Sequence, residues 1–221
     1  MNDIENIYSK LWQLYGPQGW WPAPDYHPGD YNFPGTENQK FEICVGAILT
    51  QNTSWKNVEK AILNLKKYDL LAPEMLLTIE HKHLAQVIKS AGYFNQKARK
   101  LAVFSEYFLF LNGKSANRQE LLQLWGVGPE TADSILLYAF SQPTFVVDSY
   151  TKRLLTHLGL IKGAERYDHI KALFESCLPK DVILYQEYHA LIVAHAKLHY
   201  SKKPYALNCL INKNWNTKRT D

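Results

Sequence analysis

The sequence predicts an all-α fold. From Phe41 onward, apolar residues recur at helical spacing in one segment after another. No convincing segment alternates apolar and polar residues as a half-buried strand does, and Thr144–Val147 is too short to build a sheet. A turn with two glycines, Gly126 and Gly128, also lies between two helix-forming segments, which is typical of a helical hairpin.

The first helix is expected over Ile4–Tyr15, where apolar residues three or four apart form one stripe. Gly16 and the proline after it end this helix. The following loop, residues 16–38, is rich in proline and cannot be regular helix. Loops of this length are uncommon and often functional.

The remaining helices follow in quick succession. Phe41–Thr50 is apolar on most faces, which predicts a buried helix. Trp55–Lys67 carries one apolar stripe. Further helices are expected over Pro73–Leu77, His83–Lys89, Asn95–Leu111, Arg118–Trp125, Pro129–Phe140, Ser149–Leu158, Tyr167–Cys177 and Asp181–Leu198.

Charge and hydropathy narrow the classes of function. The net charge of +4 is compatible with nucleic-acid binding but does not require it. Basic residues gather after Ala196, where a solvated tail is an equally good interpretation. The N-terminal segment is polar and no apolar run reaches membrane length, so we expect a cytoplasmic protein with no membrane partner. No self-complementary stripe stands out, so we expect a monomer.

The cysteines argue against a metal centre. The chain has three, Cys44, Cys177 and Cys209, which lie far apart and form no CxxC pair. This pattern indicates neither a zinc site nor a disulfide framework, and no metal site is predicted.

The stretch from Leu124 to Asp133 is the most informative part of the chain. Glycine permits a positive φ and close backbone approach, and Pro129 suits the first position of a helix. The turn amides and the helix N-terminus would then form an anion site that a DNA phosphate fits without base specificity. An ordinary corner between two helices would show the same glycines, so the surrounding motifs decide. The candidate phosphate-contacting residues are Gly126, Val127, Gly128, Glu130 and Thr131.

Three motifs in order resemble the endonuclease III superfamily of helix-hairpin-helix DNA glycosylases. The first is LWGVGPETAD at 124–133 with PTFVVDSYTKRLLTHLGL at 143–160, which is similar to the family's hairpin, Gly/Pro-rich loop and aspartate. The second is GAILTQNT at 46–53, and the third is AGYFNQKA at 91–98. Together they cover roughly residues 41 to 160.

The resemblance implies two helical lobes with a DNA-binding cleft between them. One lobe would be a six-helix unit over 36–142 that contains the hairpin, and the other would join 1–35 to 143–221. Asp148 would be the catalytic carboxylate, stabilising positive charge on the sugar and orienting or deprotonating water. Taken alone, Asp148 before Ser149 favours the role of a helix cap over that of a catalytic residue; the motifs around it favour catalysis, and the two roles are compatible.

Two positions depart from the family pattern. Members that also cleave the strand have a lysine where Glu130 stands here, and a glutamate cannot form the Schiff base. We therefore expect a monofunctional glycosylase. Many members hold a four-iron, four-sulfur cluster through four cysteines near the C-terminus, where only Cys209 remains, so no iron-sulfur cofactor is predicted. The family's hairpin can hold a monovalent cation through carbonyls, and the sequence leaves that open.

The chain most resembles the 3-methyladenine DNA glycosylase branch, which implies duplex DNA with an alkylated purine as substrate. A base alkylated at a ring nitrogen is cationic, so an aromatic slot would attract it. The slot is expected from Trp20, Trp21, Pro22 and Trp55, although Trp20 and Trp21 could instead staple the loop to the core.

By the same resemblance, further residues would contact the duplex. Gln51 is the expected plug of the gap left by the flipped base, and Tyr93 the expected wedge. Phosphate contacts are expected from Lys97, Lys152 and Lys197, which the sequence does not distinguish from solvated lysines.

Three alternatives stay open. The first is an endonuclease III-like glycosylase for oxidised pyrimidines, because Glu130 argues only against the lyase step. The second is a noncatalytic DNA-binding protein that uses the hairpin alone, and the third is a helical domain with no DNA role. Salt-dependent duplex binding would exclude the third.

Overall fold

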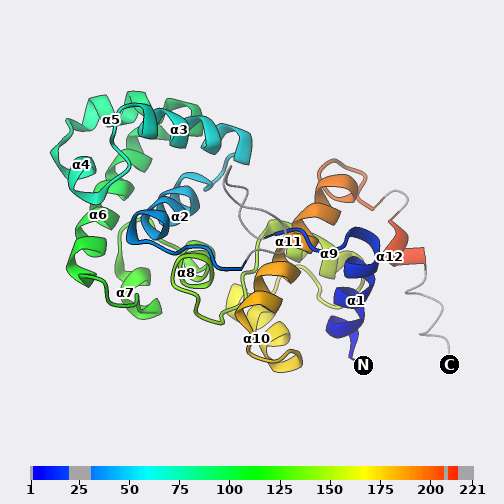
Figure 1. Cartoon of the computed structure of the whole chain (residues 1–221). Coiled ribbons are helices and arrows are strands. Elements are labelled where there is room, and N and C mark those ends of the chain that lie inside the picture. Colours follow the sequence, from blue (N-terminus) through cyan, green and yellow to red (C-terminus); the bar gives the residue numbers. More distant parts are fainter. Residues whose placement is uncertain (1, 20–30, 207–208, 214–221) are drawn as a thin grey trace. The chain divides into compact units, whose positions relative to one another are not determined.

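The structure is a computed structural model that describes residues 2–19, 31–206 and 209–213. Within these ranges all regular secondary structure is helical, so the predicted all-α fold is confirmed (Figure 1). The chain divides into two compact units. We call Asn32–Gln142 the hairpin unit, and Met1–Tyr31 with Pro143–Asp221 the Asp148 unit.

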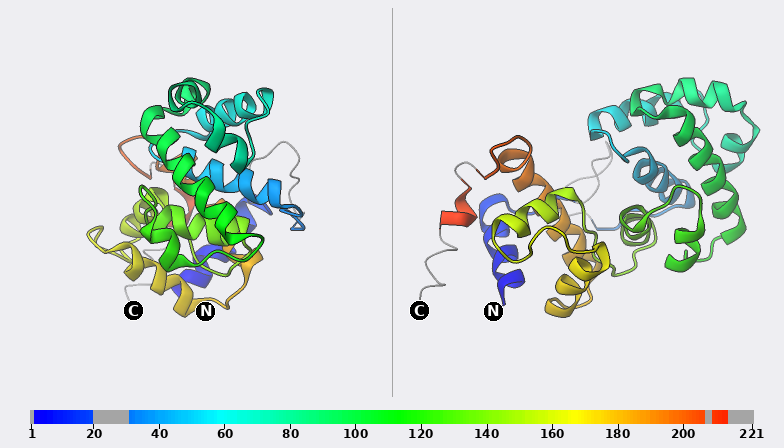
Figure 2. Two further views of the ribbon diagram at one scale, coloured as in Figure 1. Left: turned by 90° about the vertical axis from the view of Figure 1, so that its left-hand side faces the viewer. Right: turned by 180° about the vertical axis from the view of Figure 1, so that it is seen from behind.

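The hairpin unit is built around one buried helix. Its helices are α2 (Glu37–Leu49), α3 (Trp55–Lys67), α4 (Pro73–Thr78), α5 (His81–Val87), the 3-10 helix η1 (Lys89–Ala91), α6 (Phe94–Leu111), α7 (Arg118–Gln123), α8 (Pro129–Ser134) and the π-helix η2 (Ile135–Ala139). Helix α2 packs against α3, α6, α8 and η2, as Figure 2 lets the reader follow. Its residues from Ile43 to Leu49 are buried, which confirms the helix predicted to be apolar on most faces.

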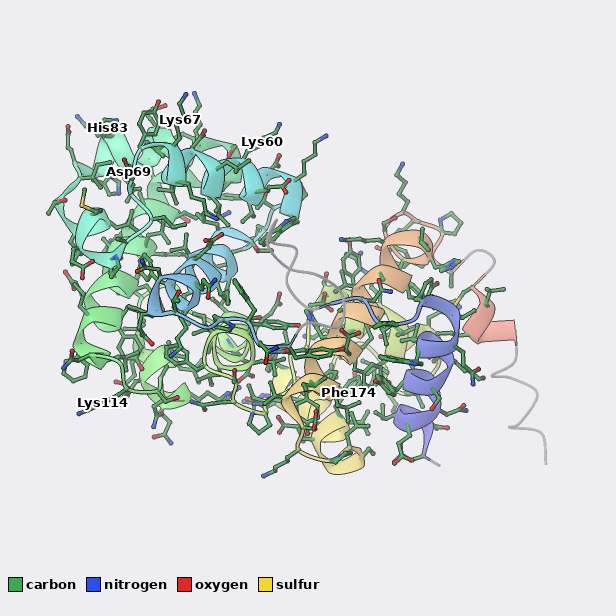
Figure 3. The ribbon with its side chains drawn as sticks, viewed as in Figure 1. Lys60, Lys67, Asp69, His83, Lys114 and Phe174 are labelled. Atoms are coloured by element: carbon green, nitrogen blue, oxygen red, sulfur yellow. The ribbon has the colours of Figure 1, made fainter. Side chains whose placement is uncertain are left out.

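The Asp148 unit joins the two ends of the chain. Its helices are α1 (Asp3–Tyr15), α9 (Ser149–His157), α10 (Tyr167–Cys177), α11 (Val182–His199) and α12 (Leu210–Lys213). Helix α11 packs against both α1 and α9, although α1 lies near the start of the chain. The core contains the stacked rings of Phe145 and Phe174, whose centroids are 3.9 Å apart (Figure 3 labels Phe174). Tyr185 and Tyr188 meet Phe145 edge-on.

Helix α2 begins at Glu37, inside the segment expected to be loop, and two further elements differ in kind from the expectation. The helix that starts at Pro129 is not uniform, because it continues from α8 into the π-helix η2. The basic tail is not all solvated, because Cys209 and Ile211, the latter within the short helix α12, are buried. None of the helices in the described ranges is long and apolar enough to cross a membrane.

Candidate functional site

The hairpin turn lies between α7 and α8 in the hairpin unit. Gly126 has φ +85°, a backbone conformation that residues other than glycine rarely adopt. The amide of Val127 donates to the carbonyl of Leu124 over 3.1 Å, which closes the turn. Gly128 is the N-cap of α8, and Pro129 takes the first helical position. The first-turn amides of a helix have no intrahelical acceptor, so this end can offer donors to an anion.

An ion pair with a buried carboxylate ties the two helices of the hairpin together. Arg118 begins α7, and its Nε and Nη2 lie 2.8 and 3.1 Å from the Oδ1 and Oδ2 atoms of Asp133 in α8. The Asp133 side chain is buried. Glu130, by contrast, is exposed in the first turn of α8.

Gln51 lies against the hairpin. Its Nε2 donates to the Gly126 carbonyl over 3.0 Å and to Thr131 Oγ1 over 2.9 Å. Its Oε1 accepts a hydrogen bond from Lys100 Nζ. The predicted plug and the predicted phosphate site are therefore in direct contact.

Helix α6 supplies a second contact to the same turn. The guanidinium of Arg99 lies over the ring of Trp125, 4.3 Å from its centroid. Arg99 is exposed and the Trp125 side chain is 44% exposed. Because stacking uses only the face of a guanidinium, the N–H groups in its plane can still bind a phosphate.

The expected phosphate contact by Lys97 does not hold in this structure. Lys97 is 1% exposed, and its Nζ donates to the carbonyls of Leu49 and Ala91 over 2.8 and 2.7 Å. Burial, and next the charge of Lys100, lower the pKa of Lys97 to about 8. This lysine joins the end of α2 to the start of α6, so its ammonium is used inside the unit.

Asp148 is placed by the Asp148 unit at the start of α9. Its Oδ1 accepts from the amide and the hydroxyl of Thr151 over 2.7 and 2.8 Å, so the capping role is confirmed. Its Oδ2 lies 3.8 Å from Nε2 of His189 in α11, beyond hydrogen-bond distance. Among the described residues, no donor is within hydrogen-bond distance of Oδ2.

Burial favours the neutral form of the histidine beside Asp148. Burial lowers the pKa of His189, and the nearby Asp148 carboxylate opposes this shift only in part. A neutral imidazole does not cancel the charge of the carboxylate. One oxygen of Asp148 thus caps α9, while the other makes no hydrogen bond to the described residues.

The other predicted residues lie as follows. Tyr93 is 65% exposed and has φ 47° at the start of α6, so its ring is available at the surface. Trp55 is half-buried at the first position of α3. Lys152 is half-buried in α9, and Lys197 is exposed in the last turn of α11. Trp20, Trp21 and Pro22 lie outside the described residues.

The donors near the C-terminus do not fit an iron-sulfur cluster. The Sγ atom of Cys209 lies 3.2 Å from Nε2 of His195 and 3.4 Å from the Tyr200 hydroxyl. Cys44 belongs to the other unit, and a four-thiolate site needs one more cysteine than this sequence has. In the described ranges, no three His, Cys, Asp or Glu side chains gather as metal ligands.

Several residues around the site were missed by the sequence analysis. Arg99 and Lys100 continue the basic run that begins at Lys97, so that run was the available signal. Asp133 follows Ala132 on the buried side of α8, and an acid there signals a partner. His189 is 41 residues after Asp148 in the printed sequence, and no local pattern links the two.

Comparison with known proteins finds similarity to proteins of DNA repair. Residues 45–180 match the model of the HhH-GPD superfamily of base excision DNA repair proteins. A Methanocaldococcus jannaschii protein, provisionally named a DNA repair glycosylase, is 45% identical over 219 residues, which are 94% of this chain and 93% of the relative. Endonuclease III of Thermotoga maritima is 30% identical over 149 residues, covering 66% of this chain and 68% of the relative.

Solved structures share the fold. The 3-methyladenine DNA glycosylase of H. pylori, solved with bound 1,N6-ethenoadenine, has a TM-score of 0.69 and 27% identity over 89% of this chain and 98% of that one. A trapped endonuclease III–DNA covalent intermediate has a TM-score of 0.72 at 21% identity, over 92% of this chain and 90% of that one. At this lower identity the second likeness concerns the fold.

Proposed function

Because the chain belongs to the HhH-GPD superfamily and is a base excision repair DNA glycosylase, we propose that it hydrolytically removes an N-alkylated purine, such as 3-methyladenine, from duplex DNA. Asp148 is the proposed catalytic residue. The observation that supports this assignment is that the two carboxylate oxygens differ in their contacts. Oδ1 caps α9, and Oδ2 has no donor within hydrogen-bond distance among the described residues.

The proposed reaction needs only a carboxylate and water. The bond between the sugar C1′ and the base breaks, and its electron pair leaves with the cationic base, which becomes neutral. The positive charge that develops on the sugar is stabilised by Asp148. Water then adds its oxygen to C1′ and passes its proton to the carboxylate or to solvent. Neutral His189 beside Oδ2 leaves the charge of Asp148 in place for this step.

The hairpin is the proposed phosphate site. The turn at Gly126–Gly128 and the first turn of α8 offer backbone donors, which recognise phosphate without reading bases. Exposed Arg99, stacked on Trp125, would add a charged contact beside them. Lys152 and Lys197 remain proposed contacts on the Asp148 unit.

The choice of an alkylated purine is supported by chemistry and likeness. A cationic leaving group needs little acid catalysis and gains roughly 0.5–2 kcal/mol over an aromatic face. Half-buried Trp55, with Trp20, Trp21 and Pro22, is proposed to form that face. The H. pylori enzyme of similar structure is named for 3-methyladenine and was solved with an ethenoadenine. We expect Trp55→Ala to lower excision much more than nonspecific binding.

An oxidised pyrimidine is the second candidate substrate. The observation that favours it is the endonuclease III relative from Thermotoga maritima at 30% identity. Both candidates use the same hairpin and aspartate, so the substrate panel must contain both kinds of lesion.

The deciding experiment measures base release from methylated duplex DNA by the wild type and by Asp148→Asn. Release of 3-methyladenine by the wild type and its loss in the variant would establish the substrate and the residue together. Release only from duplexes with oxidised pyrimidines would move the assignment to the second candidate. Salt-dependent binding without release from either panel would leave a noncatalytic DNA-binding protein.

A further inference from the structure

The side-chain amide of Gln51 is engaged at both of its ends within the hairpin unit. Its nitrogen donates to the Gly126 carbonyl and to Thr131 Oγ1, so both N–H groups meet the hairpin. Its oxygen accepts from Lys100 Nζ. Segments from α6, α8, the turn and the end of α2 therefore meet at one glutamine.

Lys100 also packs on the backbone of the turn. A Cβ atom on Gly126 would lie 2.5 Å from Cε and 2.7 Å from Cγ of Lys100, so the absence of a side chain at Gly126 leaves the room that the lysine stem fills. Gly126 has φ +85°, and as a glycine it has a wide conformational choice in the unfolded and the fluctuating turn. The stem of Lys100 thus packs on this glycine, and its ammonium donates to Gln51.

We propose that Lys100 is a positioning residue: together with Gln51 it forms a brace that fixes the hairpin turn in its phosphate-binding shape before DNA arrives. This inference rests on the proposed function, since it assumes that the turn binds DNA phosphate. The brace gives Gln51 a role in the DNA-free chain that the predicted duplex plug does not include. Contact with the turn is made by Gln51, and Lys100 acts through it and through its own stem.

The physical effect is preorganisation. A glycine turn that fluctuates must be ordered when phosphate binds, and that ordering lowers affinity. The effects of removing Gln51 and Lys100 on binding should also not add, because removing either residue already releases the turn. Removing Gln51 changes no charge, so its effect separates turn geometry from direct attraction between Lys100 and phosphate.

The first test needs no DNA. Amide hydrogen exchange is measured in the free protein for the wild type, Gln51→Ala, Lys100→Met and the control Lys67→Met. Lys67 projects from the end of α3, on the side of the hairpin unit away from α7 and α8 (Figure 3). We expect several-fold faster exchange in Gln51→Ala and Lys100→Met at the amides of Val127 and Ala132, which donate to the carbonyls of Leu124 and Gly128, and unchanged exchange in the control.

The second test measures the Kd for an undamaged duplex. Gln51→Ala and Lys100→Met should each raise the Kd about three- to tenfold. The Kd of the double variant should not exceed the higher of the two single-variant values. Lys100→Arg, which keeps a charged donor, should stay within about twofold of the wild type. The slope of log Kd against log salt should be unchanged in Gln51→Ala, because no phosphate contact is lost.

Separate outcomes contradict the brace and the proposed function. Unchanged exchange at Val127 and Ala132, or single-variant effects on Kd that multiply in the double variant, would overturn the brace. The same holds if Gln51→Ala weakens binding only to duplexes with a lesion, since that is the behaviour of a plug alone. Absence of salt-dependent duplex binding by the wild type would instead overturn the DNA-binding role of the hairpin, whatever the exchange data show.

Discussion

The guanidinium of Arg118 holds the buried carboxylate of Asp133 at two points, so α7 and α8 are joined by a charged contact as well as by the glycine turn. Such a bidentate pair fixes orientation as well as distance. The angle between the two helices of the hairpin is therefore constrained away from the turn itself.

Removing Arg118 should destabilise the hairpin unit. In Arg118→Met the Asp133 charge would stay buried without its guanidinium, and breaking a buried pair costs on the order of 3 kcal/mol. Urea unfolding would measure this loss against Lys67→Met, an exposed change expected to stay within about 0.5 kcal/mol. Equal stability of the two variants would show that the pair contributes nothing to the fold.

The two roles of Asp148 should separate by substitution. Asparagine caps a helix about as well as aspartate, so Asp148→Asn should keep the wild-type stability while losing base release. Asp148→Ala should lose base release and also about 1 kcal/mol of stability, because the cap to Thr151 is gone. Thermal unfolding and single-turnover release together make the measurement, and residual release near the wild-type rate in Asp148→Asn would end the catalytic assignment.

Glu130 should prevent covalent trapping. A carboxylate cannot form a Schiff base with the sugar, and Glu130 is exposed in the first turn of α8, where the expected lyase lysine would stand. Borohydride treatment during turnover should therefore give no protein–DNA adduct and leave the strand intact at the abasic site. A substantial adduct in the wild type would mean that another amine performs the lyase step.

Local sequence patterns predicted most of the helices because each helix repeats its apolar residues at helical spacing. The helix Tyr167–Cys177 begins and ends where it was expected, and the buried character of α2 followed from its composition. Helix α12 was not predicted, because a helix of four residues is too short to show an apolar repeat at helical spacing. The π-helix η2 was not predicted either, since the spacing of apolar residues does not distinguish it from an α-helix.

For the candidate site, motifs located the turn and the aspartate but not their supporting contacts. Asp148 lies beside His189, and Gln51 lies beside Lys100. Each neighbour comes from another helix, so only the folded chain brings the two residues of each pair together. The phosphate contact predicted for Lys97 was wrong, because the sequence of a helical motif does not show whether its lysine faces solvent or two carbonyls of the chain.

The stability of the Asp148 unit should depend on pH through His195. This imidazole is buried, with Nδ1 2.8 Å from the Tyr15 hydroxyl and Nε2 3.2 Å from Cys209 Sγ. Burial, and next the nearby His199, lower the pKa of His195 to about 4 from the ordinary value of 6.5. Tyr200 is the other titratable group beside the ring.

The sign of the effect follows from proton counting. Between pH 6.5 and 4 the unfolded chain protonates this histidine while the folded chain does not, so the free energy of unfolding falls as the pH falls. The contribution of one such group is up to about 1.4 kcal/mol per pH unit and is fully present above pH 6.5. Urea unfolding of the wild type and His195→Gln across this window should show a smaller slope in the variant. His199→Gln should also reduce the slope, because removing the neighbouring charge raises the pKa of His195. Identical slopes in all three proteins would show that His195 titrates alike in the folded and unfolded chains, and that its burial carries no proton-linked free energy.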